Sequence, residues 1–229
     1  MQIVTVKSYD EMSNLASKMI AEQIKSKPDS VLGLATGSSP VGTYEKLIKR
    51  HKRDGLDFSC VTTFNLDEYC DLSRKHPQSY YTFMMENLFS HINIPSKNIN
   101  FPDDNFEKYE KKIKNSGGID LQLLGVGHNG HIGFNEPDDV FHNKTHKIQL
   151  AESTIRANAR FFNSMDDVPK TAITMGIGTI MAAKKIILVA GADKASVINE
   201  LKKETVSPQF PVSILHYHPN CTIIHASSS

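Results

Sequence analysis

The chain has few cysteines, little net charge and no long apolar run, and each of these features excludes a class of protein. Its three cysteines, Cys60, Cys70 and Cys221, lie far apart without a CxxC pair. We therefore expect reduced thiols and not a disulfide framework.

A net charge of +1 gives no electrostatic reason to expect a nucleic-acid partner. No apolar run approaches the ~20 residues that span a bilayer. The first residues, MQIVTVKSYDE, lack the basic and apolar regions of a signal peptide. These features predict a cytoplasmic protein that binds neither nucleic acid nor a membrane.

Short apolar runs alternate with amphipathic segments along the 229 residues. The predicted strands are residues 2–6, 31–35, 61–66, 119–126, 185–191 and 221–226. Helical patterns lie between them, and the first begins with a capping-box pair, Ser8 and Glu11. Strands that alternate with helices predict an α/β fold with a mostly parallel, doubly wound sheet and helices on both faces. No repeat or linker divides the chain, so we expect a single domain over residues 1–229.

The stretch from Ile119 to Pro137, IDLQLLGVGHNGHIGFNEP, combines a buried strand with polar residues suited to chemistry. Its apolar half runs into glycines at positions 125, 127, 130 and 133. The polar side chains among and after these glycines are His128, Asn129, His131, Asn135 and Glu136. Open α/β sheets bind ligands at the carboxyl ends of their strands, so we expect the functional site here.

Three interpretations of this stretch compete. Residues 125–130 (GVGHNG) match a dinucleotide fingerprint, but that fingerprint opens a helix, whereas here it runs into HIGFNEP. His128, His131 and Glu136 suggest a metal site, but no HExxH motif or cysteine partner accompanies them. A histidine oriented by a carboxylate is a competent acid or base near neutral pH. We favour this third interpretation for His131 over a structural histidine, and we predict no metal and no cofactor.

A second polar turn follows the predicted strand 31–35. Its residues are Thr36, Gly37, Ser38 and Ser39. Pro40 suits the first position of a helix, with Ser39 as its N-cap. Free N–H groups and hydroxyls at a helix N-terminus form a good anion site. An ordinary capped turn would have the same sequence, so the turn alone does not decide between the two.

Asp67 and Glu68 follow directly after the predicted strand 61–66. We expect one carboxylate to point into the cleft at the sheet edge, although a solvated acidic loop is the simpler interpretation of this segment alone. Asp67 and His131 would supply two proton-transfer groups beside a phosphate cradle. That set suits proton transfer on a phosphorylated sugar without a cofactor. The segment Ser153–Pro169 has weak periodicity and is interpreted either as a lid or as a surface helix.

Seven segments resemble, in order, the motifs of the glucosamine-6-phosphate deaminase family. They are LGLATGSSPVGTY, TFNLDEY, HPQSYY, GVGHNGHIGFNEP, RANARFF, GIGTI and GADKAS, and they extend from residue 32 to residue 196. The resemblance covers essentially the whole chain, and GHxGFNEP combined with FNLDEY is highly specific. It implies a Rossmann-like three-layer sandwich. It also implies conversion of glucosamine 6-phosphate and water to fructose 6-phosphate and ammonia, in amino-sugar catabolism.

The resemblance implies a role for each catalytic residue. Asp67 would be the base that moves a proton between C2 and C1 of the sugar. His131, oriented and charged by Glu136, would open the sugar ring. Many members carry an aspartate where this chain has Asn129. The amide still forms hydrogen bonds but lacks a negative charge that would favour protonated His131, so we expect a different pH profile.

The resemblance also implies a phosphate site and an oligomeric state. The phosphate would bind to residues 36–39, with Arg160 and Lys194 as cationic clamps. Hexameric members bind N-acetylglucosamine 6-phosphate as an effector through a serine and basic residues after FNEP. The residues at those places here are Asp139, His146 and Ile148. The longer C-terminal extension is also missing, so we expect no activation by that effector and a monomer or homodimer.

Three other functions compete with deamination. A 6-phosphogluconolactonase shares the fold and a related GHxAS-type motif, but this chain continues with GFNEP. A sugar-phosphate sensor of a transcription regulator would need a helix-turn-helix module, for which residues 1–30 leave no room. The third alternative, a catalytically silent paralogue, is compatible with the sequence.

Overall fold

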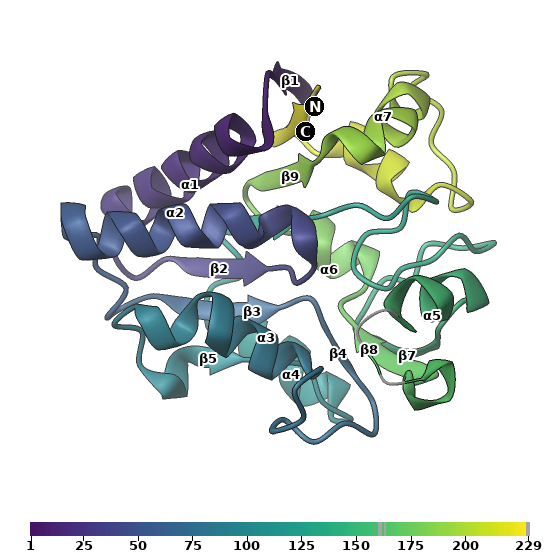
Figure 1. The fold of residues 1–229 in the computed structure, drawn as a ribbon, viewed down its shortest axis with the longest axis horizontal. Helices are drawn as coiled ribbons and strands as arrows, with labels where there is room; N and C mark the ends of the chain where they lie inside the picture. Colours follow the sequence, from purple (N-terminus) through teal and green to yellow (C-terminus); the bar gives the residue numbers. More distant parts are fainter. Residues whose placement is uncertain (160–161, 163, 228–229) are drawn as a thin grey trace.

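The computed structural model describes residues 1–159, 162 and 164–227 (Figure 1). Seven strands form one sheet in the order β1-β10-β9-β6-β2-β3-β5, and all neighbours in it are parallel. Their bounds are β1 (Gln2–Val6), β2 (Val31–Leu34), β3 (Thr62–Asn65), β5 (Ile99–Asn100), β6 (Leu121–Leu124), β9 (Ile186–Ala190) and β10 (Cys221–Ala226). The predicted parallel α/β sheet is therefore confirmed.

The order of the strands reverses beside β2. The chain passes from β2 to β3 and β5 on one side, then returns to β6 on the other side of β2 and continues to β9 and β10. A doubly wound sheet opens a crevice at such a reversal, outside the carboxyl ends of the strands. The carboxyl ends of β2, β3, β6 and β9 all lie at that edge, because these strands are parallel neighbours.

Helices cover both faces of the sheet, which gives the predicted three layers (Figure 1). On one face lie α1 (Tyr9–Ser26), α2 (Ser38–Asp54) and α3 (Tyr80–Asn87), and on the other α4 (Phe106–Asn115), α6 (Ile177–Met181) and α7 (Ala195–Leu201). Strand β9 shows how the sheet serves both cores. Ile186 and Leu188 pack with α4, α6 and α7, whereas Ile187 and Val189 pack with α1 and α2. Successive side chains of a strand point to opposite faces, so a fully apolar strand fills both layers.

The first helix begins as its sequence predicts. Ser8 is the N-cap of α1, and its hydroxyl accepts the N–H of Glu11 at 3.2 Å. The carboxylate of Glu11 accepts the N–H of Lys7 at 2.9 Å. Both ends of the capping pair therefore satisfy backbone donors near the helix start, although the glutamate reaches one residue beyond the usual partner.

A second, antiparallel sheet was not predicted. It has the order β4-β8-β7, with β4 (Asp67–Tyr69), β8 (Thr171–Thr174) and β7 (His146–Gln149). One residue, Leu66, separates β3 from β4, so the chain passes directly from the large sheet into the small one. Helix α5 (Glu152–Asn158) and a one-turn helix (Met165–Asp167) lie between β7 and β8. The small sheet has its own apolar cluster, formed by Tyr69, Phe134, Leu150 and Ala172.

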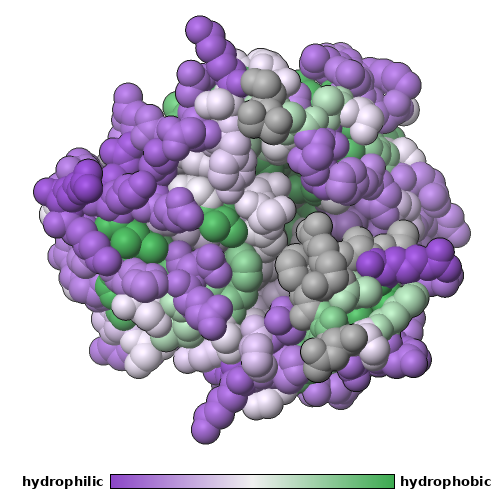
Figure 2. All heavy atoms as spheres, in the orientation of Figure 1, coloured by the Kyte–Doolittle hydropathy of each residue, from purple (hydrophilic) through white to green (hydrophobic). Residues whose placement is uncertain are grey.

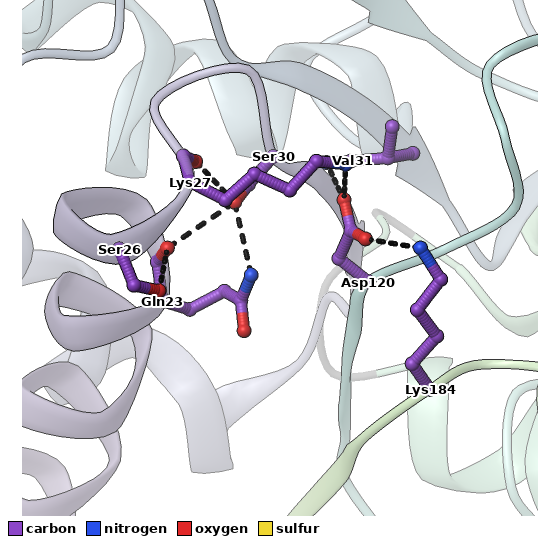
Figure 3. Close-up of polar contacts among 7 residues, drawn as sticks. All are labelled: Gln23, Ser26, Lys27, Ser30, Val31, Asp120 and Lys184. Atoms are coloured by element: carbon purple, nitrogen blue, oxygen red, sulfur yellow. Dashed lines mark hydrogen bonds and ion pairs between the residues drawn. The ribbon is translucent and has the colours of Figure 1, made fainter.

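A buried carboxylate joins three segments at the amino edge of the large sheet (Figure 3). Asp120, directly before β6, lies 2.6 Å from Lys27 Nζ and 2.7 Å from Lys184 Nζ, and it accepts the N–H of Val31 at 2.8 Å. Burial opposes the charged form of Asp120, but the two lysines and the N–H group outweigh it and lower its pKa. This network lies at the end of the sheet opposite the strand ends that form the crevice.

The surface carries few apolar side chains. On the face shown in Figure 2, hydrophilic residues predominate and hydrophobic ones form small separate areas. Among the described residues, the large exposed hydrophobic ones are Met1, Val140, Met165 and Tyr217. In the described part of the chain, no helix is long and apolar enough to cross a membrane.

Candidate active site

The loop after β6 forms a hydrogen-bonded cluster around one carboxylate. Glu136 Oε2 lies 3.3 Å from His131 Nδ1 and accepts the Asn129 side-chain amide at 2.6 Å. Its other oxygen, Oε1, accepts the hydroxyl of Thr154 from α5. The Asn129 carbonyl oxygen accepts the His131 N–H at 3.2 Å. Three of the four side chains predicted as catalytic are thus brought together, and Thr154 is an addition that the sequence did not indicate.

The cluster keeps Glu136 ionised. Burial opposes its charged form, but contacts with His131, Thr154 and Asn129 outweigh burial and lower the pKa of Glu136 to about 2. A carboxylate with this pKa carries its negative charge throughout the neutral range and favours a positive charge on a neighbouring imidazole. The arrangement can therefore hold the His131 ring in one orientation while it donates or accepts a proton.

Glycine is required at two positions in this loop. A Cβ atom on Gly127 would lie 2.2 Å from the His131 ring, so any side chain there would displace the imidazole. Gly130 has a φ of +85° and faces the ring of Phe210, which a Cβ atom would approach to 2.3 Å. Two of the glycines that resemble a dinucleotide fingerprint thus serve close packing, Gly127 against His131 and Gly130 against Phe210.

Asp67 lies at the start of β4, where it is buried. Its backbone pairs with Thr174 of β8, and the residue is 6 % exposed. A Cβ atom on Gly133 would lie 3.5 Å from Asp67 Oδ2, so the loop of His131 passes close to this carboxylate. The interpretation of this segment as a solvated acidic loop was therefore wrong, because pairing with β8 draws it into the small sheet.

Burial also changes the chemistry of Asp67. Desolvation and, secondarily, the charge of Glu68 raise its pKa from the ordinary value of 3.8 to about 8. Such a group is a stronger base than a solvated carboxylate and exchanges a proton near neutral pH.

The neighbouring Glu68 has a different environment. Its carboxylate accepts the N–H groups of Tyr69, Tyr80 and Tyr81, each at 2.9 Å. Desolvation raises its pKa, while these three backbone donors oppose the rise. Glu68 therefore anchors the start of α3 to β4 through backbone donors, whereas Asp67 is the carboxylate that lies close to the loop of His131.

The predicted anion turn is a helix N-terminus, but its cap differs from the prediction. Helix α2 begins at Ser38, its N-cap is Gly37, and no side chain caps it. The prediction of Ser39 as N-cap was therefore wrong, because Gly37 adopts a φ of +94° that favours glycine and starts the helix two residues earlier. Gly37 and Ser38 are exposed, and Thr36 and Ser39 are half-buried. The uncapped first turn offers N–H groups to an anion at the edge where the strands end.

Lys194 comes to the same edge from the turn after β9. Its Nζ lies 2.8 Å from Nδ1 and 3.0 Å from Nε2 of His128, and 3.2 Å from Asp193 Oδ2. The lysine side chain is 11 % exposed, so its charge is held at one place beside the β6 loop. The second predicted cation, Arg160, lies outside the described residues.

The two histidines considered as metal ligands have separate partners. His131 contacts Glu136, whereas His128 contacts Lys194 and Asp193. Among the described residues, no group of three or more histidine, cysteine, aspartate or glutamate side chains is arranged to hold a metal ion.

The fold and the site define a class of protein: a doubly wound α/β protein with an acid–base cluster and a helix N-terminus at the carboxyl edge of its sheet. Comparison with known proteins makes the assignment narrower. The chain belongs to the family of glucosamine-6-phosphate isomerases and 6-phosphogluconolactonases, whose model matches residues 6–224.

Three known proteins resemble the chain over nearly its whole length, and two of them are deaminases. The glucosamine-6-phosphate deaminase of Thermoanaerobacter pseudethanolicus is 51% identical, over 98% of this chain and 92% of the relative. The solved structure of a monomeric glucosamine-6-phosphate deaminase superposes with a TM-score of 0.96 at 43% identity, covering 99% of this chain and 97% of that one. The 6-phosphogluconolactonase of Thermotoga maritima, with a TM-score of 0.76 at 20% identity over 98% of each chain, shares the fold.

Proposed function

We propose that this protein converts glucosamine 6-phosphate and water to fructose 6-phosphate and ammonia without a cofactor. The observation that carries the proposal is the buried Asp67 carboxylate close to the loop that holds the His131–Glu136 pair. The deaminase names of relatives at 51% and 43% identity support the same reaction.

Ring opening is the first step. His131 takes the proton from the C1 hydroxyl and returns one to the ring oxygen as the C1–O5 bond breaks, which leaves an open-chain aldehyde. Glu136 stabilises the imidazolium that forms between the two transfers. Its low pKa, about 2, keeps it ionised for this purpose. Asn129 and Thr154 fix the carboxylate and thereby the ring of His131.

Isomerisation and deamination follow. Asp67 removes the proton from C2, the electron pair moves to the aldehyde, and the oxygen on C1 takes a proton from solvent to give an enolamine. Asp67 then delivers that proton to C1, so the C–N bond at C2 becomes an iminium. Water adds to C2, the C–N bond breaks, and ammonia leaves as the ketone forms, which returns one proton to solvent. A base with a pKa near 8 suits removal of a weakly acidic carbon-bound proton.

The phosphate group holds the sugar in register for these steps. It binds the N–H groups and hydroxyls of residues 36–39 at the start of α2, together with Lys194, and Arg160 is its second cationic ligand. A helix N-terminus favours an anion through both its free donors and its dipole. Binding energy at the remote phosphate then positions C1 and C2 against Asp67.

We also propose that the protein is a monomer or a homodimer, forms a single domain, acts in the cytoplasm and is not activated by N-acetylglucosamine 6-phosphate. The monomeric state named for the relative at 43% identity supports the first of these. Light scattering that gives the mass of a hexamer would contradict it, and an effector-dependent substrate saturation curve would contradict the last.

The test of the reaction is ammonia release from glucosamine 6-phosphate, linked to detection of fructose 6-phosphate. Wild type is compared with Asp67→Asn, which removes the base, and we expect a loss of ~10²–10⁴-fold in kcat. The matched control is Asp71→Asn, the same chemical change at an exposed position whose φ of 64° asparagine tolerates.

Each outcome of that test has a separate meaning. Turnover of 6-phosphogluconolactone in place of glucosamine 6-phosphate would overturn the proposal in favour of a lactonase, and loss of activity with chelator would show a metal requirement. No turnover of either substrate would favour a sensor or a silent paralogue. Full activity of the Asp67 variant would contradict its role as the base even if the reaction is correct.

A further inference from the structure

Three charged or titratable side chains meet beside the predicted phosphate site. Lys194 Nζ contacts both ring nitrogens of His128, at 2.8 and 3.0 Å. His128 Nε2 lies 3.3 Å from Asp193 Oδ2, and the same oxygen lies 3.2 Å from Lys194 Nζ. The three groups therefore form a closed triangle that joins the β6 loop to the turn after β9.

The backbone of that turn is shaped to hold the triangle. The Asp193 side chain folds back over its own turn, so a Cβ atom on Gly191 would lie 2.8 Å from Asp193 Oδ1. Its Oδ2 then faces both Lys194 and His128. Lys194 is nearly buried, whereas the side chains of His128 and Asp193 are 70% and 61% exposed. The imidazole therefore lies on the solvent side of the ammonium, where an arriving anion would meet it.

The three side chains of the triangle carry too little net positive charge to neutralise a phosphate dianion. Lys194 and Asp193 cancel each other when His128 is neutral. A proton on His128 adds one positive charge next to the ammonium, which is unfavourable in the empty site and favourable beside a phosphate dianion. Among the described residues, Lys194 and Asp193 are the charged groups in contact with His128, and on its own loop the titratable groups that follow are His131 and Glu136.

We propose that His128 belongs to the phosphate site. While the site is empty, the neutral ring of His128 holds the ammonium of Lys194 in place. Once protonated, the ring acts as a further cation against the bound phosphate, with Asp193 as its counter-ion. This inference rests on the proposed function only in taking Lys194 as a phosphate ligand. It predicts that phosphate and the His128 proton bind cooperatively, since each favours the other by the same amount.

The direct test uses the wild-type protein and inorganic phosphate. The ring resonances of the histidines are followed by NMR as the pH is changed, with and without phosphate. An opposite charge within 4–6 Å shifts a titration by about 1–3 pH units, and for an exposed ring we expect the lower end, about 1 unit upward for His128. His142, which likewise contacts an aspartate, with its Nε2 2.9 Å from Asp138 Oδ2, is the matched histidine, and its titration midpoint should not change. A His128 midpoint that phosphate leaves unchanged would overturn the proposal.

The kinetic test compares wild type with His128→Gln between pH 5.5 and pH 8.5. Glutamine keeps a hydrogen-bonding group but cannot take the proton. A shift of 1 pH unit corresponds to a tenfold change in affinity, so the ratio of the variant KM to the wild-type KM should be about tenfold larger at the acidic end. The kcat ratio should stay flat, because His128 does not touch the reacting carbons. The titration of the substrate's own phosphate cancels in the ratio of the KM values, since both proteins receive the same substrate.

The controls separate this inference from the proposed reaction. His142→Gln should give a KM ratio that does not change with pH, and circular dichroism checks that the exposed substitutions leave the fold intact. A KM ratio for His128→Gln that is equally flat would contradict the inference while ammonia release continued to support the reaction. If wild type releases no ammonia, the proposed function fails, but the NMR titration with phosphate still decides the role of His128.

Discussion

Replacement of Asp67 by asparagine tests the electrostatics of the site through stability as well as activity. The side chain is 6 % exposed, and burial together with the charge of Glu68 raises its pKa from 3.8 to about 8. A raised pKa means that the folded protein holds a proton that the unfolded chain has already released at neutral pH. The contribution of Asp67 to stability is therefore full below pH 3.8 and is lost as the pH rises through about 8.

The size of this loss follows from the shift. Each pH unit between the two pKa values costs about 1.4 kcal/mol, so ionising Asp67 between pH 5 and pH 8 costs roughly 4 kcal/mol of folding free energy. Asparagine has almost the same shape and never ionises. We therefore expect Asp67→Asn to be more stable than wild type, by a margin that grows by about 4 kcal/mol over that range.

The assay is urea unfolding of both proteins at pH 5 and pH 8.5, with Asp71→Asn as the exposed control. The same preparations give the activity, which should fall by ~10²–10⁴-fold in Asp67→Asn. A stability margin that is equal at the two pH values would refute the argument, because it would mean that Asp67 ionises in the folded protein as easily as in the unfolded chain. A stabilised but inactive variant would show that the site holds its base at a cost in stability.

The wild-type pH profile gives a further prediction: kcat/KM should rise with pH and level off near 8, where Asp67 ionises. Glu136→Gln should lower kcat by about tenfold or more, because the negative charge that stabilises the imidazolium of His131 is gone. Lys194→Met should raise KM for the sugar phosphate by about 10- to 100-fold, since a charged hydrogen bond contributes about 1.5–3 kcal/mol. Asp120→Asn should cost a few kcal/mol of stability and leave KM unchanged, because its network lies at the opposite edge of the sheet.

Specific results would contradict the predictions for Asp120→Asn and Lys194→Met. Because the pKa of Asp120 is lowered, the stability it contributes is present above its unfolded pKa of 3.8 and is lost as the pH falls through its folded value. Unfolding curves of wild type and Asp120→Asn should therefore converge in acid, and a constant difference would contradict the role of the charge. For Lys194→Met, a fall in kcat at unchanged KM would place the lysine in the chemistry and not in phosphate binding.

Local sequence patterns determined the layered fold and half of the site. Fully apolar runs such as Ile186–Ala190 predict strands buried on both faces, and the short spacing between strands and helices predicts the parallel order. The pairing of His131 with Glu136 was also predictable, because the two residues lie five positions apart in a loop whose glycines allow a tight course. In each case the interacting groups are close in the chain, so the pattern contains both partners.

Only the tertiary structure decided the environment of the remaining groups. Strand β4 has three residues, too few for a periodic pattern, and the residue that pairs with Asp67 in the small sheet is Thr174, more than a hundred residues away. The contact between His128 and Lys194 likewise spans 66 positions. Packing of such remote segments is the main cause of the raised pKa of Asp67, with the charge of the adjacent Glu68 second, because desolvation depends on what packs against a carboxylate. The sequence thus indicated Asp67 as the candidate base, and the fold supplies the buried environment that raises its pKa.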